Sequence, residues 1–449
     1  MRKKLAETTV LLISTLKWSV LATIVGMTVG LSTAIFLKTL NWSISHTGQY
    51  SYYYLLLPAA FFVSAITIKY LAPDAEGHGT EKVIEAVHKY SGKIKIMVIP
   101  VKLVTSVITL AFGGSAGKEG PCAQIGGGVS SVLADILRLD DNDRKKLVIC
   151  GISAGFAAVF GTPVAGAIFG VEVLFIGGLL YDILLPSFIA GIISYHVSAG
   201  LGVTHFHHST KLALVYNDSL LIKMIIAGIL FGLVSFLLIE TMNLFHNLSS
   251  KIQIWKPFKG LIGGSLLIVL TLLFSTQYLG LGLDTIQATL TGTDIIWYAF
   301  LLKIIFTAIT LNFGGSGGVI TPIFFIGATS GVVFANFLGL DKGTLAAIGL
   351  VSLLAGATNT PIASSIMAIE LFGADIAPYA ALACIISFLM TGHRSIYPSQ
   401  VLGIRKSSSI QVEIGKEIGE TDTMTQHRKK SLINMVTVIG RIVKEKFIK

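Results

Sequence analysis

The sequence predicts an all-α membrane protein built from two inverted repeats of tilted and broken helices. Three observations lead to this fold class. Hydrophobic residues make up 53% of the 449 residues and charged residues only 13%, about half the charged share of an ordinary soluble domain. The apolar runs have the wrong lengths for simple membrane spans and contain many of the 47 glycines. Two motifs also recur in the same order and at nearly the same spacing.

The apolar runs follow one another through most of the chain. A perpendicular helix needs about 20 apolar residues, whereas several runs are nearer 14 and others approach 30. Short, broken and tilted helices are therefore expected. Broken backbone at membrane depth is stable only inside protein or beside a watery cavity, as in transport proteins. The runs lie at 9–40, 51–72, 93–112, 123–137, 147–176, 178–200, 219–240, 257–280, 295–312, 320–340, 343–356, 360–373 and 376–392.

Other classes of protein are excluded by the cysteines and by the start of the chain. Cys122, Cys150 and Cys384 show neither disulfide nor metal-ligand spacing, and we interpret all three as buried core residues. The basic start resembles a signal peptide, but its apolar run continues towards residue 40 without a cleavage site. We expect this run to be the first membrane-embedded segment.

An internal repeat sets the organisation of the chain. Residues 113–121 read GGSAGKEGP and residues 314–322 read GGSGGVITP, which agree at five of nine positions. A second pair, GTPVAGAIFGVEV at 161–173 and NTPIASSIMAIEL at 359–371, shares Thr, Pro, Ala, Ile and Glu in register. The chain is therefore two copies of one fold. An odd number of crossings in each half would invert the second copy relative to the first, and an even number remains open at this stage.

The end of the chain differs from both repeats. Residues 405–449 hold ten Lys/Arg and five Asp/Glu, so we expect a basic tail, helical over 431–447, that lies against anionic lipid. The positive-inside rule accounts for this charge, and nucleic acid is not an expected partner. Both termini are then cytoplasmic, in a multi-pass protein of the plasma (inner) membrane. We divide the chain into a first repeat over 1–216, a second over 217–404 and the tail over 405–449.

The two Gly-rich breaks predict a binding site for an anion. Each break leads directly into an apolar helix, and a helix start presents free backbone N–H groups at the positive end of the helix dipole. The apolar segments hold few carboxylates of the kind that cation transporters use, namely Glu119, Glu172 and Glu370. Because Glu172 and Glu370 are repeat-equivalent, we expect them to be structural residues that cap or bridge inside their own halves.

Glu119 differs from these two because its repeat counterpart is Ile320. A carboxylate beside an anion-binding helix start can compete with the anion and move away when it is protonated, which suits a gate or a proton carrier. The structural alternative is a first-turn glutamate that complements the helix dipole. We expect Lys118 to snorkel or to face a water-filled entrance rather than to hold the substrate.

These motifs resemble the chloride channel and H+/Cl− exchanger (CLC) family over about residues 10–405. The resemblance lies in GKEGP at 117–121, GGVITP at 317–322, the GTPVAGAIFGVE helix and SIYPS at 395–399. It implies two inverted repeats around an anion path, cytoplasmic termini and a homodimer in which each subunit has its own pore. The type implied is prokaryotic, without C-terminal CBS domains.

The resemblance also implies roles for particular residues. Glu119 matches the gating glutamate, Val319 and Ile320 match a motif whose amides contact the central anion, and Tyr397 matches the inner-gate tyrosine. His78, in GHGTE at 77–81, stands where the family has a selectivity-determining Ser or Pro. The full set of candidate anion-binding residues is His78, Gly117, Lys118, Gly318, Val319, Ile320 and Tyr397.

The expected function is transport of chloride or a similar small anion through a Glu119-gated pore with H+ coupling. No catalytic set is present, so the protein is not an enzyme, and no cofactor or metal is expected besides chloride as the ligand. The inner carboxylate of typical exchangers is replaced by Val173. A passive voltage- or pH-gated chloride channel and a fluoride/H+ exchanger therefore remain alternatives. Outside the family, a cation-coupled symporter is the alternative, while the intact GKEGP and Tyr397 favour chloride.

Overall fold

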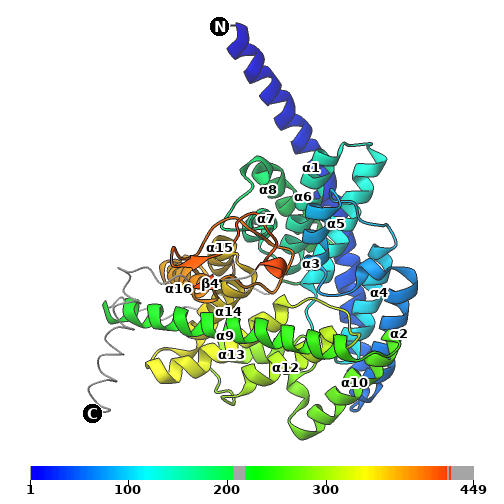
Figure 1. The fold of residues 1–449 in the computed structure, drawn as a ribbon, viewed down its shortest axis with the longest axis vertical. Helices are drawn as coiled ribbons and strands as arrows, with labels where there is room; N and C mark the ends of the chain where they lie inside the picture. Colours follow the sequence, from blue (N-terminus) through cyan, green and yellow to red (C-terminus); the bar gives the residue numbers. More distant parts are fainter. Residues whose placement is uncertain (1, 206–217, 422–423, 426–449) are drawn as a thin grey trace.

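The computed structural model describes residues 2–205, 218–421 and 424–425, and it is mostly helical (Figure 1). The predicted helix over 431–447 lies outside the described residues. The first half contains α1 (Arg2–Thr47), α2 (Leu57–Leu71), α3 (Thr80–Lys89), α4 (Val98–Ala111), α5 (Glu119–Ile136), α6 (Asp141–Phe160), α7 (Pro163–Glu172) and α8 (Tyr181–Gly200).

The second half repeats this order of helices. It contains α9 (Asp218–Lys251), α10 (Lys256–Leu273), α11 (Leu283–Leu290), α12 (Ala299–Asn312), α13 (Ile320–Leu338), α14 (Lys342–Thr358), α15 (Pro361–Phe372) and α16 (Ala377–Met390). Each helix of one half therefore has a counterpart in the other, and the predicted duplication of helices is confirmed.

Short elements join these helices. Strand β1 (Phe175–Ile176) pairs in parallel with β2 (Val401–Leu402), and β3 (Ile410–Gln411) pairs antiparallel with β4 (Met424–Thr425). The 3₁₀ turns are η1 (Tyr53–Leu56), η2 (Pro73–Ala75), η3 (Thr276–Tyr278), η4 (Ala374–Ile376) and η5 (Ile418–Glu420).

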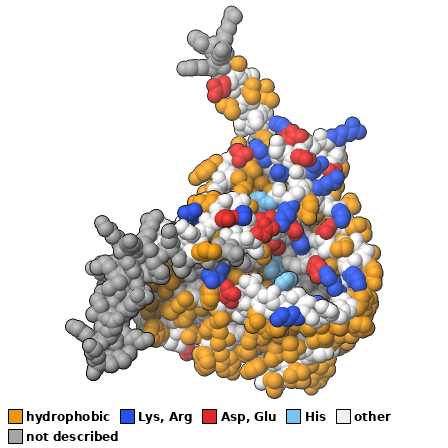
Figure 2. Space-filling model, in the orientation of Figure 1, with side chains coloured by type: hydrophobic (Ala, Val, Ile, Leu, Met, Phe, Trp, Pro, Cys, Tyr) orange, Lys and Arg blue, Asp and Glu red, His pale blue; other side chains and the backbone are white. Residues whose placement is uncertain are grey.

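The outer surface suits a membrane. Among the described residues, six helices are long and apolar enough to cross one, and they include residues 6–47, 220–251 and 320–338. Large apolar side chains cover much of the lower surface in Figure 2, and charged side chains gather around a hollow above them. Exposed apolar residues such as Leu272 and Leu273 on α10 belong to this surface. The fold is that of a multi-pass integral membrane protein.

The long apolar run predicted over 147–176 is broken into α6 and α7. Helix α6 starts at Asp140, whose side chain accepts a bond of 2.9 Å from the Asp143 N–H, and it ends at Gly161 in the left-handed conformation. Helix α7 then begins with Pro163, which needs no N–H partner at this position. The same break separates α14 from α15 in the second half.

The two halves are joined by reciprocal hydrogen bonds. The Ser115 N–H donates to the Thr310 hydroxyl at 3.0 Å, and the equivalent Ser316 N–H donates to the Thr109 hydroxyl at 2.9 Å. The buried Lys102 amine donates to the carbonyls of Ala75 and Gly77, and its counterpart Lys303 donates to the carbonyls of Tyr278 and Gly280. These matched bonds relate the halves by a pseudo-two-fold axis.

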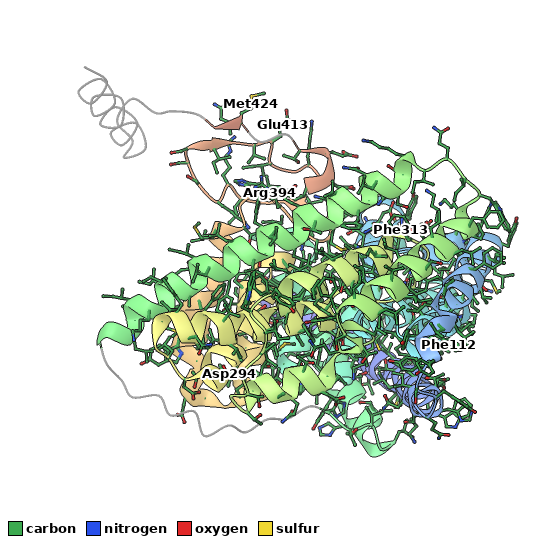
Figure 3. All side chains as sticks on the ribbon, turned by 90° about the horizontal axis from the view of Figure 1, so that it is seen from below. Phe112, Asp294, Phe313, Arg394, Glu413 and Met424 are labelled. Carbon is green, nitrogen blue, oxygen red and sulfur yellow. The ribbon has the colours of Figure 1, made fainter. Side chains whose placement is uncertain are left out.

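The second repeat is inverted relative to the first. Phe112 and Phe313 follow α4 and α12 at equivalent places in the two repeats. Figure 3 shows Phe313 nearer the face that carries Glu413 and Arg394, and Phe112 nearer the opposite face with Asp294. Equivalent helix ends thus lie towards opposite faces, which settles the orientation that hydropathy left open.

Glu172 and Glu370 act across the repeat boundary. The Glu172 carboxylate accepts bonds from the Ile362 and Ala363 N–H groups at 3.0 and 2.8 Å, at the start of α15. Glu370 accepts in the same way from Val164 and Ala165 at 2.9 and 2.7 Å, at the start of α7. The expected capping is present, but the expectation that each glutamate acts inside its own half is wrong.

Removing one of these caps should destabilise the protein. Glu172→Ala leaves two helix-start N–H groups without their acceptor, which costs about 1–3 kcal/mol for each group that stays unpaired. We expect the apparent melting temperature of the detergent-solubilised protein to fall by several degrees. Glu240→Ala removes only an exposed ion pair with Arg394 and should change it little. Equal melting temperatures for both variants would contradict the capping role.

Candidate anion site

Three backbone segments meet where the two repeats join. The Gly117 and Gly318 backbones exchange two hydrogen bonds of 2.7 Å, which form an antiparallel bridge between the Gly-rich breaks. Gly120 lies against the His78 carbonyl and against the Gly318 Cα, which a Cβ on Gly120 would approach to 2.8 Å. The starts of α3, α5 and α13 are thereby drawn together, and there is no space for a side chain at position 120.

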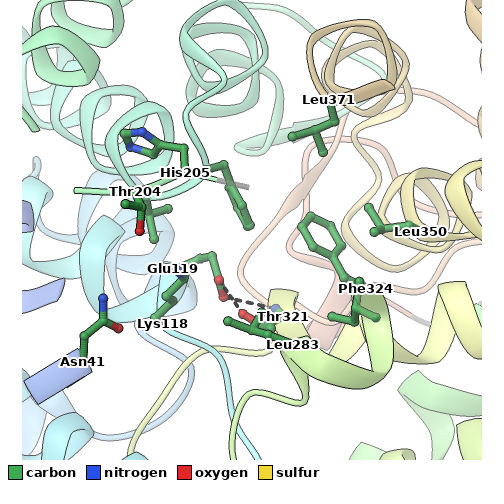
Figure 4. Close-up of a pocket in the computed structure, with 13 residues that line it drawn as sticks. Asn41, Lys118, Glu119, Thr204, His205, Leu283, Thr321, Phe324, Leu350 and Leu371 are labelled. Atoms are coloured by element: carbon green, nitrogen blue, oxygen red, sulfur yellow. Dashed lines mark hydrogen bonds between the residues drawn. The ribbon is translucent and has the colours of Figure 1, made fainter. Parts of the chain in front are cut away.

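Glu119 reaches from the start of α5 to the start of α13. Its side chain is fully buried, and its carboxylate accepts a 3.1 Å bond from the Thr321 N–H and a second bond from the Thr321 hydroxyl (Figure 4). An N–H in the first turn of a helix is a group to which a small anion binds well. The Glu119 carboxylate of the first repeat is therefore bound by donors that the second repeat supplies.

Three further candidate residues lie around this contact. Val319 caps the start of α13 and Ile320 is its first residue, and both apolar side chains are buried. Lys118 is partly exposed and lines a cavity of about 270 Å³ together with Glu119 and Thr321.

His78 lies beside the same site, just before α3. Gly79, which follows it, has a φ of 78° and approaches the Gly120 carbonyl too closely for any side chain. The His78 Nδ1 atom is buried and has no hydrogen-bond partner within the part of the chain that is described. One buried polar atom near the helix start is thus open to a ligand.

Tyr397 lies on a tightly held loop. It is 1% exposed, and two residues further along the loop the Ser399 N–H and hydroxyl donate to the Glu81 carboxylate. The Gln400 amide holds this loop by donating to the carbonyls of Val173 and Thr358 at 2.6 and 2.8 Å. The sequence-predicted residues His78, Glu119, Ile320 and Tyr397 therefore come from four separate segments that converge on one region.

Sequence reasoning missed several residues of this site. Thr321 has no marker in the sequence beyond its place at the repeat position of Gly120. Gln400, Ser399 and Glu81 carry no motif of their own. One signal was available: GLGLD at 280–284 repeats the pattern of GHGTE at 77–81 and shows that both precede a short helix.

No metal centre competes with this interpretation within the described ranges. They contain no group of three or more His, Cys, Asp or Glu residues that could hold an ion. The three cysteines are buried and unpaired by disulfides, as their apolar surroundings predicted.

Comparison with known proteins identifies the class. The model of the voltage gated chloride channel family matches residues 59–392. A chloride/fluoride channel protein of Pseudomonas syringae pv. tomato is 36% identical over 397 residues, 87% of each chain. An H(+)/Cl(−) exchange transporter ClcA of Klebsiella pneumoniae is 27% identical over 381 residues, 78% of this chain and 80% of the relative. The chain belongs to the voltage-gated chloride channel (CLC) family of anion transport proteins.

Solved structures agree with the fold. The crystal structure of a CLC-type fluoride/proton antiporter superposes with a TM-score of 0.82 and 28% identity, and the match covers 86% of this chain and 98% of that one. A slow cyanobacterial Cl−/H+ antiporter, at 21% identity, has a TM-score of 0.73 over 83% and 94% of the two chains. The family comprises transporters and channels rather than enzymes, and the cation-coupled symporter is set aside.

The close backbone contacts at Gly120 predict a severe effect of a single methyl group. In Gly120→Ala the new Cβ would overlap the His78 carbonyl and crowd Gly318, so the three helix starts must separate. We expect anion flux in liposomes to fall at least tenfold, together with a lower melting temperature. Gly200→Ala meets nothing within 4 Å and should behave as wild type. Normal flux in Gly120→Ala would contradict the assembled site.

Proposed function

We propose that this protein exchanges fluoride for protons across the membrane. The observation that carries the proposal is the Glu119 carboxylate on the first-turn N–H and the hydroxyl of Thr321. An anion and an ionised carboxylate compete for these donors. Protonation neutralises Glu119 and weakens its hold, so that an anion enters as the proton binds. The ionised carboxylate and the anion thus occupy this position in alternation, and because the carboxylate leaves it when a proton binds, anion and proton movement are coupled.

Fluoride is favoured by likeness and by the donor set. The relatives with 36% identity and with a TM-score of 0.82 are described as a chloride/fluoride channel protein and a fluoride/proton antiporter. Fluoride is the smallest halide and the strongest hydrogen-bond acceptor among them. Fluoride loses its hydration water when it enters the site. The N–H and O–H donors of His78, Thr321 and Tyr397, together with the helix-start N–H groups, can replace that water. Chloride, which the intact GKEGP and Tyr397 favour, is the second candidate.

The assembly and placement in the cell follow the same family. We propose a homodimer with one anion path in each subunit, in the plasma (inner) membrane, with lipid around its apolar surface. Both termini are placed in the cytoplasm by the basic residues near them. The face that carries Arg394 and Glu413, which we call the tail face, is then cytoplasmic.

Coupled exchange is tested with purified protein in liposomes. With a fluoride gradient and no proton gradient, we expect uphill H+ movement in the direction opposite to fluoride. Chloride at the same gradient should drive less H+. Anion flux without uphill H+ would identify a passive channel, and greater H+ movement with chloride would identify chloride as the substrate.

Glu119→Gln is the matched variant for this assay. The amide mimics the protonated carboxyl group, so the fold should remain intact while H+ movement is abolished and anion flux loses its dependence on pH. The measurement is flux at several pH values in dimeric protein checked by size-exclusion chromatography. Retention of the wild-type pH dependence would reject the gating role of Glu119.

His78 is predicted to set the preference among anions. In the tautomer that carries the ring proton on Nδ1, the buried imidazole donates one hydrogen bond to an anion, worth about 0.5–1.5 kcal/mol or roughly 2–10-fold in affinity. His78→Ser should change the fluoride/chloride and chloride/nitrate permeability ratios by this factor, and His78→Pro should shift the second ratio towards nitrate. Unchanged ratios in both variants would show that the ring does not contact the permeating anion.

A further inference from the structure

A proton that reaches Glu119 from the tail face needs a carrier. Position 173, where typical exchangers of the family have a carboxylate, does not provide one. Val173 is fully buried and apolar, and its carbonyl accepts the Gln400 amide. Resting on the proposed H+ coupling, we propose that Glu81 is the proton-carrying residue on the tail face, where it delivers protons towards Glu119 past Tyr397.

The first observation is the state of the Glu81 carboxylate. One oxygen, Oε1, accepts bonds from the Ser399 N–H at 3.1 Å and the Ser399 hydroxyl at 2.6 Å. The other, Oε2, is buried and has no partner among the described residues. A carboxylate with one oxygen fixed and the other unpaired is oriented by its neighbours and is still able to take up a proton.

The second observation is the position of Glu81 between the Tyr397 loop and the start of α5. Tyr397 is 1% exposed and lies two residues before Ser399, whose N–H and hydroxyl donate to the Glu81 carboxylate. On its other side, Glu81 lies in the first turn of α3, whose start packs against Gly120, the residue that follows Glu119. Glu81 is thus held next to both the Tyr397 loop and the helix start that carries Glu119.

The third observation is the surroundings of Glu81 towards the tail face. On α3, Lys82 pairs with Glu85 at 2.8 Å, and Lys89 pairs with Glu417 at 2.9 Å. These charged side chains are partly exposed, and Figure 2 shows charged groups gathered over this part of the surface. The charged groups near Glu81 on its own helix are Lys82 and Glu85, which pair with each other, and its contact from the loop is Ser399, two residues after Tyr397. Glu81 lies at the border between this hydrated surface and the buried site.

The transfer is a balanced relay. Glu81 Oε2 forms an O–H bond with a proton from tail-face water, and the carboxylate becomes neutral. That O–H bond then breaks, and the proton passes Tyr397. It forms a new O–H bond with the Glu119 carboxylate. Glu81 returns to the ionised state and Glu119 is neutralised, so one proton has moved from the water at the tail face to Glu119.

Glu81→Gln separates proton carriage from a structural role. The amide oxygen can still accept both bonds from Ser399, but the side chain no longer titrates. We expect fluoride-driven uphill H+ movement in liposomes to fall at least tenfold, with anion flux within about twofold of wild type, because the gate position itself is intact. Glu85→Gln, one turn further along α3 and paired with Lys82, is the matched control and should keep wild-type H+ movement.

The outcomes of this experiment decide between the possible roles. Unchanged H+ movement in Glu81→Gln, with the wild type coupled, overturns the role of Glu81 but leaves the proposed function standing. A wild type without uphill H+ overturns both. If the Gln variant does not fold, Glu81→Asp decides: H+ movement reduced at least threefold with unchanged anion flux supports the proposal, and unreduced H+ movement overturns it.

Discussion

The fold of the site depends on one contact, the pair of backbone hydrogen bonds between Gly117 and Gly318. Two helices of opposite orientation begin within three residues of this pair, so their positive ends converge on the same small volume. The approach is possible only because both positions lack a side chain. The matched bonds of Ser115 and Ser316 then fix the two breaks against α12 and α4. The remaining helices of each repeat are arranged around this junction.

Much of this arrangement could be predicted from the sequence. The repeat of GGSAGKEGP as GGSGGVITP indicated both the duplication and the two helix starts, and the mismatch of Glu119 with Ile320 singled out the glutamate. These predictions succeed because a Gly-rich break before an apolar helix has few structural outcomes. The resemblance supplied His78 and Tyr397, which have no local pattern that marks them.

Hydropathy could not predict two short helices or the hydrogen bonds that join the repeats. Helices α3 and α11 were not predicted because they are short and carry charged or polar residues. The start of α3 nevertheless packs against Gly120, and Leu283 of α11 lines the cavity beside Glu119. Glu172 and Glu370 were expected to act within their halves, since sequence distance says nothing about a partner 190 residues away. The hydrogen bond from the Gln400 amide to the Val173 carbonyl could not be predicted for the same reason, because it forms only when the two repeats pack together.

The two repeats share one backbone arrangement, so equivalent positions with different residues indicate where their roles differ. Gly120 and Thr321 occupy equivalent positions, but only Gly120 is pressed between the His78 carbonyl and Gly318. Position 321 is free to carry a hydroxyl, and position 119 carries a carboxylate where its counterpart is Ile320. Because the repeats differ at the position pairs 119/320 and 120/321, the two equivalent helix starts carry different chemical groups. One repeat contributes the acidic group and the other contributes the N–H and hydroxyl that bind it. A symmetric pair of starts would attract anions equally from both faces, whereas this pair holds a group whose charge depends on protons.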